Sequence, residues 1–157
     1  MKIQPITPTY RNEVNEILKK EWDCPPSVSR GRAIDTTTLD GFIFLENGKI
    51  KGLITYNIEN TDCEIATLIS LSENKGIGTA LVEATKAAAK ENACTRLWLI
   101  TTNDNTSAIR FYQKKGFEWV ATHINAMDVA REIKPSIPLL GTDGIPIKHE
   151  IEFEMVI

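Results

Sequence analysis

A short apolar segment that runs into a glycine loop and then into a helix constrains this fold more than any other stretch. The apolar residues 68–71 are followed by Gly76 and Gly78, and helix-forming residues begin directly after them. Glycines let backbone N–H groups converge in such a turn, and the start of a helix adds about half a unit of positive charge. The loop therefore predicts a binding place for an anionic group such as a phosphate.

Two nucleotide-binding motifs also place glycines between a strand and a helix, and neither matches this loop. No Gly-Lys-Ser/Thr sequence follows, and Leu81 occupies the position of the third glycine in the dinucleotide motif. Taken alone, the loop also fits a tight turn between a strand and a helix. A second motif further along the chain decides between these interpretations.

Length and composition indicate a single domain, 1–157, with one core. The chain has 157 residues, of which 42% are hydrophobic and 25% charged, and it can bury roughly two thirds of its unfolded surface. The net charge is -3 with Lys and Arg scattered, which favours neither nucleic acid nor a membrane as a partner. No signal peptide and no membrane-spanning apolar run is found, so we expect a soluble, cytoplasmic protein.

The cysteines indicate reduced thiols rather than disulfides or a metal site. Cys24, Cys63 and Cys94 are odd in number and far apart, without a CxxC pair or a neighbouring His cluster. We therefore expect buried thiols and no metal.

The hydrophobic pattern predicts an α/β (α+β) fold with a mixed, mostly antiparallel sheet flanked by helices. Asn47-Gly48 between apolar runs is a strong hairpin signal, and the three runs between 42 and 71 form an antiparallel meander. A helix at 78–91 followed by a buried strand implies one parallel pair. The predicted strands are 3–6, 42–46, 50–58, 63–71, 97–100, 117–123 and 150–157. Four helices are predicted. The first is capped by Thr9, and the second spans 78–91. The third is capped by Thr106 or Ser107 and ends at Gly116, and the fourth spans 126–133.

Two details of this pattern are tested below. The segment from Cys24 to Asp40 is too polar and interrupted for a core element, and it either lines a substrate site or is a solvated connector. In the last strand, Glu152 and Glu154 alternate with apolar residues, so we expect one face to be buried and the other to face water.

The two motifs and the order of elements resemble the GNAT superfamily of acyl-CoA-dependent N-acyltransferases. The likeness covers roughly residues 3–123. That family's pyrophosphate loop, usually Gln/Arg-x-x-Gly-x-Gly/Ala, is similar to Glu73-Asn74-Lys75-Gly76-Ile77-Gly78. Its later block, Asn-x-x-Ala-x-x-Phe-Tyr-x-Lys-x-Gly-Phe, is similar to the stretch from Asn105 through Ala108, Phe111, Tyr112, Lys114 and Gly116 to Phe117.

The resemblance implies that acetyl-CoA is the acyl donor and assigns residues that bind it. The pyrophosphate would lie on the loop formed by Asn74, Lys75, Gly76, Ile77, Gly78 and Thr79. Backbone N–H groups near Ile69, Ser70 and Leu71 would bind the pantetheine and polarise the thioester carbonyl, and Asn105 would hydrogen-bond the pantetheine arm. Glu73 departs from the family pattern, and its carboxylate must point away from the pyrophosphate or be offset by Lys75.

The resemblance also assigns catalytic residues, each with a structural alternative. Glu64 is the candidate general base acting through water, and the alternative is an exposed strand carboxylate without a role. His123 is a second candidate base, although a lone His is more often only hydrogen-bonded. Tyr112 would protonate the departing thiolate, and the alternative is a core aromatic.

The leading hypothesis is direct acetyl transfer to a primary amine in a ternary complex, and the alternative is a non-catalytic acyl-CoA-binding sensor or interaction module of the same fold. The acceptor is unidentified, and its specificity should reside in 22–40 and 123–149. Exposed edges and the irregular tail at 125–148 would allow a homodimer. Four charged residues in these segments could orient a polar substrate, and they equally fit an ordinary solvated surface: Arg30, Arg32, Asp35 and Asp128.

Overall fold

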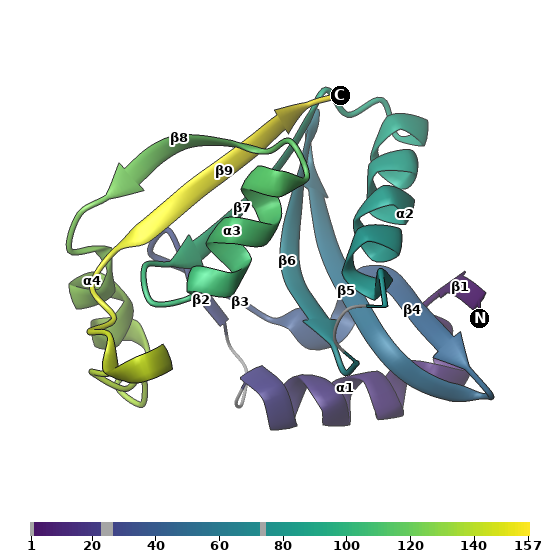
Figure 1. Ribbon diagram of the computed structural model, residues 1–157, viewed down its shortest axis with the longest axis horizontal. Helices are drawn as coiled ribbons and strands as arrows, with labels where there is room; N and C mark the ends of the chain where they lie inside the picture. Colours follow the sequence, from purple (N-terminus) through teal and green to yellow (C-terminus); the bar gives the residue numbers. More distant parts are fainter. Residues whose placement is uncertain (1, 23–26, 73–74) are drawn as a thin grey trace. The chain divides into compact units, whose positions relative to one another are not determined.

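The computed structural model describes residues 2–22, 27–72 and 75–157, which form two compact units (Figure 1). The first unit contains residues 1–25, 35–97 and 157, and the second contains 26–34 and 98–156. Both units contain strands and helices, and both contain antiparallel strand pairs, so the predicted α/β class with mostly antiparallel strands is confirmed. In the described part of the chain, no helix has the length and apolarity needed to cross a bilayer.

The first unit is built on an antiparallel sheet with the order β1-β4-β5-β6. Its hairpin between β4 and β5 turns at Asn47-Gly48, where positive φ angles of 53° and 73° match the right-handed twist of the strands. The meander predicted from the sequence is thus confirmed. The strands are β1 (Lys2–Pro5), β4 (Asp40–Glu46), β5 (Lys49–Glu59) and β6 (Asp62–Ser70).

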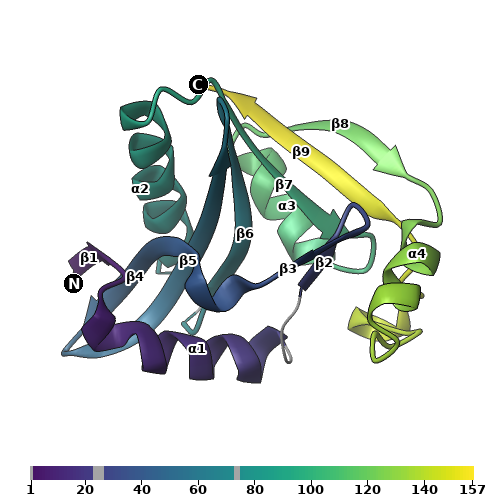
Figure 2. The same cartoon turned by 180° about the vertical axis from the view of Figure 1, so that it is seen from behind.

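Two helices, α1 (Pro8–Trp22) and α2 (Ile77–Glu91), pack on this sheet (Figures 1 and 2). Successive residues of a strand point to opposite faces, and β5 shows which helix covers which face. Leu53 packs in the core cluster that contains Val14 and Leu18 of α1. Its neighbour Gly52 faces α2, because a Cβ at Gly52 would lie 2.5 Å from Cγ2 of Ile77. The helices therefore cover opposite faces of the sheet.

The second unit contains three neighbouring strands with the order β7-β9-β8 in the sheet, and a separate hairpin of β2 and β3. Helix α4 packs through Met127 and Ala130 against Ile147, and Val28 of the hairpin joins this small core. The strands are β2 (Ser27–Ser29), β3 (Arg32–Ile34), β7 (Arg96–Thr102, which begins in the first unit), β8 (Glu118–His123) and β9 (Glu150–Val156). The helices are α3 (Thr106–Lys114) and α4 (Ala126–Ile133), and single 3-10 turns occupy Thr36–Thr38 and Thr142–Gly144.

Two predicted helix caps are wrong. Helix α1 begins at Pro8, so Thr9 lies inside the helix and does not cap it. The N-cap of α3 is Asn105, whose side chain accepts a hydrogen bond from the N–H of Ala108, and neither Thr106 nor Ser107 caps the helix. The segment from Cys24 to Asp40, for which the sequence left a substrate-site lining and a solvated connector open, contains in its described part the β2–β3 hairpin and a 3-10 turn capped by Asp35. Strands of three residues are too short to show an alternating pattern in the sequence.

The prediction that the polar face of β9 faces water is also wrong. Glu150 is only 2% exposed, and the side chain of Glu152 is 13% exposed. Both carboxylates are covered by the β2–β3 hairpin, because Arg30 at its tip contacts each of them. The alternation of polar and apolar residues predicts an exposed face of β9, but this face is buried where the distant β2–β3 hairpin packs on it.

The tail before β9 is held by polar side chains that directly follow β7. The amide of Asn103 accepts from the N–H groups of Lys148 and His149 at 2.8 and 2.9 Å, so Asn103 does more than form a turn. Asp104, 7% exposed, accepts from the hydroxyl of Thr102 and from the N–H of Thr142. These bonds tie the tail to the start of α3.

We expect Asp104→Ala to lower the free energy of unfolding by roughly 2 to 4 kcal/mol, because buried donors would lose a charged acceptor. Urea denaturation would measure the change. Glu132→Ala, an exposed helical site, is the control and should stay within about 0.5 kcal/mol of wild type. Equal stability of the two variants would contradict the role given to Asp104.

Candidate functional site

The predicted site residues lie in both units, and each group is described within its own unit. In the first unit, α2 begins after Gly76, which has a φ of 71° and no side chain to cap the helix. The N–H groups of Ile77, Gly78 and Thr79 precede the first intrahelical bond, from Ala80 to the carbonyl of Gly76. A Cβ at Gly76 would meet no atom of the described residues within 4 Å, which leaves the backbone open to a ligand on the side of these residues. This helix start suits an anion.

Part of the predicted loop is outside the described residues. Glu73 and Asn74 are not described, so the predicted effect of the Glu73 carboxylate and the predicted contact of Asn74 stay predictions. Lys75 is described and exposed next to Gly76. The first unit therefore presents backbone donors, the helix dipole and one cation at this turn.

The end of β6 provides fewer free donors than the sequence predicted. The N–H of Leu71 donates to the carbonyl of Lys51 in β5 at 2.8 Å. Backbone N–H groups alternate in direction along a strand, so Ile69 also points toward β5 and Ser70 points away from it. Of these three residues, Ser70 has the N–H that is directed away from the hairpin partner.

Glu64 lies within β6 and is buried, with 4% of its surface exposed. Its predicted alternative, an exposed strand carboxylate, is therefore wrong. The pairing of β5 and β6 shifts register between Thr55 and Tyr56, and the extra residue Ala66 lies two positions after Glu64. Such β-bulges redirect neighbouring side chains and are common next to active sites.

Tyr112 is part of an aromatic cluster of the second unit. It is 5% exposed, and its ring centroid lies 5.2 Å from Phe111, 5.3 Å from Phe117 and 6.2 Å from Phe153. The structural role as a core aromatic is confirmed, and the role as an acid stays a prediction. Burial raises the pKa of the Tyr112 hydroxyl above its usual value, so the group remains protonated at neutral pH.

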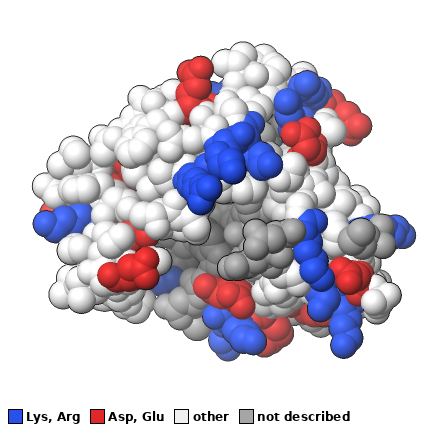
Figure 3. All heavy atoms as spheres, in the orientation of Figure 1, with Lys and Arg blue, Asp and Glu red and all other residues white. Residues whose placement is uncertain are grey.

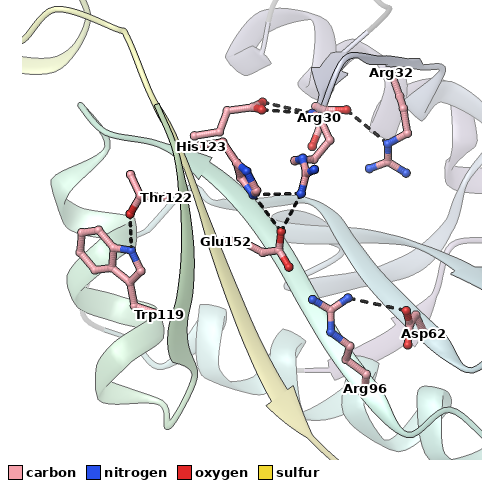
Figure 4. Close-up of polar contacts among 10 residues, drawn as sticks. Arg30, Arg32, Asp62, Arg96, Trp119, Thr122, His123 and Glu152 are labelled. Carbon is pink, nitrogen blue, oxygen red and sulfur yellow. Dashed lines mark hydrogen bonds and ion pairs between the residues drawn. The ribbon is translucent and has the colours of Figure 1, made fainter. Parts of the chain in front are cut away.

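His123 belongs to a charged cluster at the tip of the β2–β3 hairpin (Figure 4). Its Nε2 lies 3.0 Å from Oε1 of Glu152 and 2.9 Å from Nη1 of Arg30. Nη1 of Arg30 also donates to Oε1 of Glu152 at 3.0 Å. The backbone N–H of Arg30 donates to both carboxylate oxygens of Glu150, and burial raises the pKa of that carboxyl. His123 is thus a member of a network and not an isolated base.

Basic side chains mark two further places in the second unit. Figure 3 shows Lys and Arg side chains gathered over α3, a helix region whose exposed residues include Arg110, Lys114 and Lys115. In the hairpin, the guanidinium of Arg32 lies 5.5 Å from the ring centroid of Trp98. Anionic ligands would be attracted to the basic surface over α3.

The described cysteines are unsuited to covalent catalysis. Cys63 and Cys94 are buried free thiols, and burial raises the pKa of Cys63 to about 12 and also raises that of Cys94. Cys24 is not among the described residues. Within 2–22, 27–72 and 75–157, no group of His, Cys, Asp and Glu side chains is arranged to hold a metal ion.

The start of α2 can therefore bind an anionic group such as a phosphate. The match to the family model described as "Acetyltransferase (GNAT) family" spans residues 9–117. The chain therefore belongs to the GNAT acetyltransferase family.

Two relatives and one solved structure resemble this chain along nearly its whole length. It is 43% identical to the uncharacterized protein YdhI of Bacillus subtilis strain 168, covering 100% of this chain and 99% of YdhI. It is 41% identical to the uncharacterized protein YxbD of the same strain, covering 96% of each. A GNAT family acetyltransferase from Elizabethkingia anophelis, crystallised with acetyl-CoA bound, superposes with a TM-score of 0.72 at 19% identity, covering 99% of this chain and 97% of that chain. This last likeness shows the fold.

Sequence reasoning missed the carboxylates of the hairpin cluster. The sequence does not predict Glu150 as a site residue, and it predicts that Glu152 is exposed to solvent. Nothing near these residues in the sequence indicates what covers β9. The only local signal for this hairpin is Gly31, which follows Arg30; both residues take positive φ in a two-residue turn. Because Arg is unusual at the first position of such a turn, Arg30-Gly31 does not predict a hairpin from the sequence.

We expect Cys63 and Cys94 to resist alkylation in the folded protein at pH 8. A thiol with a pKa of about 12 is ionised in about one molecule in ten thousand at that pH, and burial blocks the reagent as well. Iodoacetamide labelling followed by peptide mass spectrometry would measure this. The same protein unfolded in urea is the control and should be labelled promptly; rapid labelling of folded Cys63 would contradict the burial.

Proposed function

We propose that this chain is an acetyl-CoA-dependent N-acetyltransferase that transfers acetyl directly to a primary amine within a ternary complex. The observation that carries the proposal is the open, uncapped start of α2 behind Gly76. Its N–H groups match the needs of a pyrophosphate, and the Elizabethkingia relative of the same fold holds acetyl-CoA. In this proposal acetyl-CoA is a substrate, and no metal takes part.

Donor binding is assigned to backbone donors and to a few polar side chains. The pyrophosphate is bound by the N–H groups of Ile77, Gly78 and Thr79, with Lys75 and the predicted Asn74 beside them. Ser70 is the residue near the end of β6 whose N–H is directed away from β5, which favours it as the donor to the pantetheine or to the thioester carbonyl. Asn105 contacts the pantetheine arm in addition to capping α3.

The reaction requires a neutral amine. An alkylammonium has a pKa near 10.4, so the neutral form at pH 7 costs roughly 4 to 5 kcal/mol, and a base must accept the proton. Glu64 is the proposed base, acting directly or through water, and its burial beside a bulge supports this role. The amine nitrogen then attacks the thioester carbon, and the tetrahedral intermediate places negative charge on the carbonyl oxygen, where a backbone N–H stabilises it.

Collapse of the intermediate breaks the carbon–sulfur bond and releases CoA as a thiolate. We propose that Tyr112 gives this thiolate its proton. Its raised pKa keeps the hydroxyl protonated before transfer, and a thiolate that leaves into apolar surroundings is also a stronger base than in water. Because Cys63 and Cys94 are buried thiols, an acetyl-cysteine intermediate at these positions is disfavoured.

Release of CoA thiol tests the reaction without knowledge of the acceptor. The purified protein would be incubated with acetyl-CoA and single amines of different classes, and free thiol would be followed with time. Amine-dependent, steady release and an acetylated amine detected by mass spectrometry would support the proposal. Acetyl-CoA binding without release in the presence of any amine would support the non-catalytic module instead.

We expect Tyr112→Phe to lower kcat on the order of a hundredfold while the Kd for acetyl-CoA is unchanged, because the ring keeps its packing and only the proton donor is lost. Stopped assays with the best amine and calorimetry would measure the two quantities. Tyr10→Phe, a partly buried site packed against the core of the first unit, is the matched control and should retain turnover. A Tyr112→Phe variant with wild-type turnover across the pH range would remove Tyr112 from the mechanism.

A further inference from the structure

Arg30 stands at a backbone position that Arg does not favour. Ser29 pairs with Arg32 across the β2–β3 hairpin, so Arg30 and Gly31 alone form its turn, with φ angles of 53° and 71°. Asn-Gly is the preferred pair for this geometry, and the chain uses it at Asn47-Gly48, where φ is 53° and 73°. The same turn thus occurs twice, once with the favoured residue and once with Arg. Strain of this kind at one site points to a use for the side chain.

The guanidinium of Arg30 is fixed from one side only. Glu152 and His123 contact Nη1 at 3.0 and 2.9 Å, and Glu150 holds the backbone N–H at 3.2 and 3.3 Å. Figure 4 shows the side chains of Arg30, His123 and Glu152 directed toward one another. Within the part of the chain that the structure describes, the side-chain contacts of Arg30 all pass through Nη1. The side chain is still 43% exposed.

This arrangement leaves the Nε–Nη2 edge of a pre-oriented guanidinium for a ligand. That edge carries parallel N–H donors that fit the two oxygens of a carboxylate. Glu150 and Glu152 balance the formal charges of Arg30 and Arg32, so the hairpin is not a general attractant for anions. Recognition here depends on the geometry of one guanidinium that its neighbours hold in place.

We infer that Arg30 binds a carboxylate of the acetyl acceptor, so that the acceptor is a small amine that carries its own carboxylate, as a free amino acid does. This inference rests on the proposed acetyltransferase function and deepens it by naming the acceptor class. The β2–β3 hairpin lies in the segment expected to determine acceptor specificity. Glu150 and Glu152 hold Arg30 in place, and Arg30 selects acceptors that carry a carboxylate of their own.

Matched pairs of amines test this inference. CoA release would be measured with amino acids and with their carboxamides, which keep the amine and lack the carboxylate charge. For the preferred amino acid, wild-type kcat/KM should exceed that for its amide by at least about tenfold. Because a guanidinium edge also fits a phosphate, ethanolamine and phosphoethanolamine would be included as a second pair.

The decisive variant is Arg30→Asn, which installs the turn residue found at position 47 and removes only the guanidinium. Because Arg30→Asn also takes the guanidinium away from the mostly buried Glu152 carboxylate, its thermal stability should fall below that of wild type, and its Kd for acetyl-CoA should be unchanged. We expect KM for the amino acid to rise by about ten- to a hundredfold and the preference over the amide to disappear. Arg30→Lys should recover part of the preference, and Arg96→Asn, which removes an Arg that pairs with Asp62, should keep all of it.

The outcomes separate this inference from the proposed function. Equal acetylation of acids and amides by wild type, a preference that survives in Arg30→Asn, or a preference for phosphoethanolamine above the amino acids would overturn the carboxylate assignment and leave the acetyltransferase intact. An absence of CoA release with every amine would instead overturn the proposed function, and the acceptor class with it.

Discussion

The packing of α2 against β5 is the contact on which the first unit and its ligand-binding backbone depend. It requires a residue without a side chain at Gly52, where a Cβ would meet Ile77 at the first turn of the helix and Ile69 in β6. The same contact fixes the direction in which the first N–H groups of α2 point. The donors for an anion are therefore positioned by sheet–helix packing and not by loop side chains. The proposed binding of the pyrophosphate therefore depends on the backbone donors of α2 and not on the side chain at position 73.

In the second unit, the β2–β3 hairpin covers two carboxylate side chains of β9. Glu150 and Glu152 lie on the face of β9 that alternation assigns to the surface, and Arg30 covers them. Phe153, between Glu152 and Glu154 in the sequence, points to the opposite face and packs against Tyr112. One strand thus supports the aromatic cluster around the proposed acid with one face and the charged cluster around Arg30 with the other.

Local patterns in the sequence were sufficient for the long elements. The strands β4, β5 and β6 and the helix α2 were predicted within two residues, because alternation, helical periodicity and the Asn47-Gly48 turn are encoded by neighbouring residues. The predicted cap of α3, Thr106 or Ser107, is one or two residues from the observed cap Asn105, since Asn, Thr and Ser are all good caps. The family motifs also predicted site residues at Tyr112 and in the loop before α2.

Long-range contacts were not predictable in the same way. Glu150 and Arg30 are 120 residues apart, and the burial of a carboxylate by a hairpin tip leaves no local pattern around either residue. Three backbone N–H groups at the end of β6 were candidates to bind the acyl donor, and the choice of Ser70 among them depends on the hydrogen bond from Leu71 to Lys51. Charge clusters and hydrogen-bond directions depend on tertiary structure, and these are the features that bear on acceptor choice.

The measurement that tests the central claim most directly is a calorimetric titration of the purified protein with acetyl-CoA. It requires no knowledge of the acceptor and probes the helix start on which the account depends. The account predicts one-to-one binding with a micromolar Kd that weakens at high salt, because the contacts are to a polyanion. Absence of detectable binding at low salt would contradict it, since the backbone donors of α2 would then not hold the acyl donor.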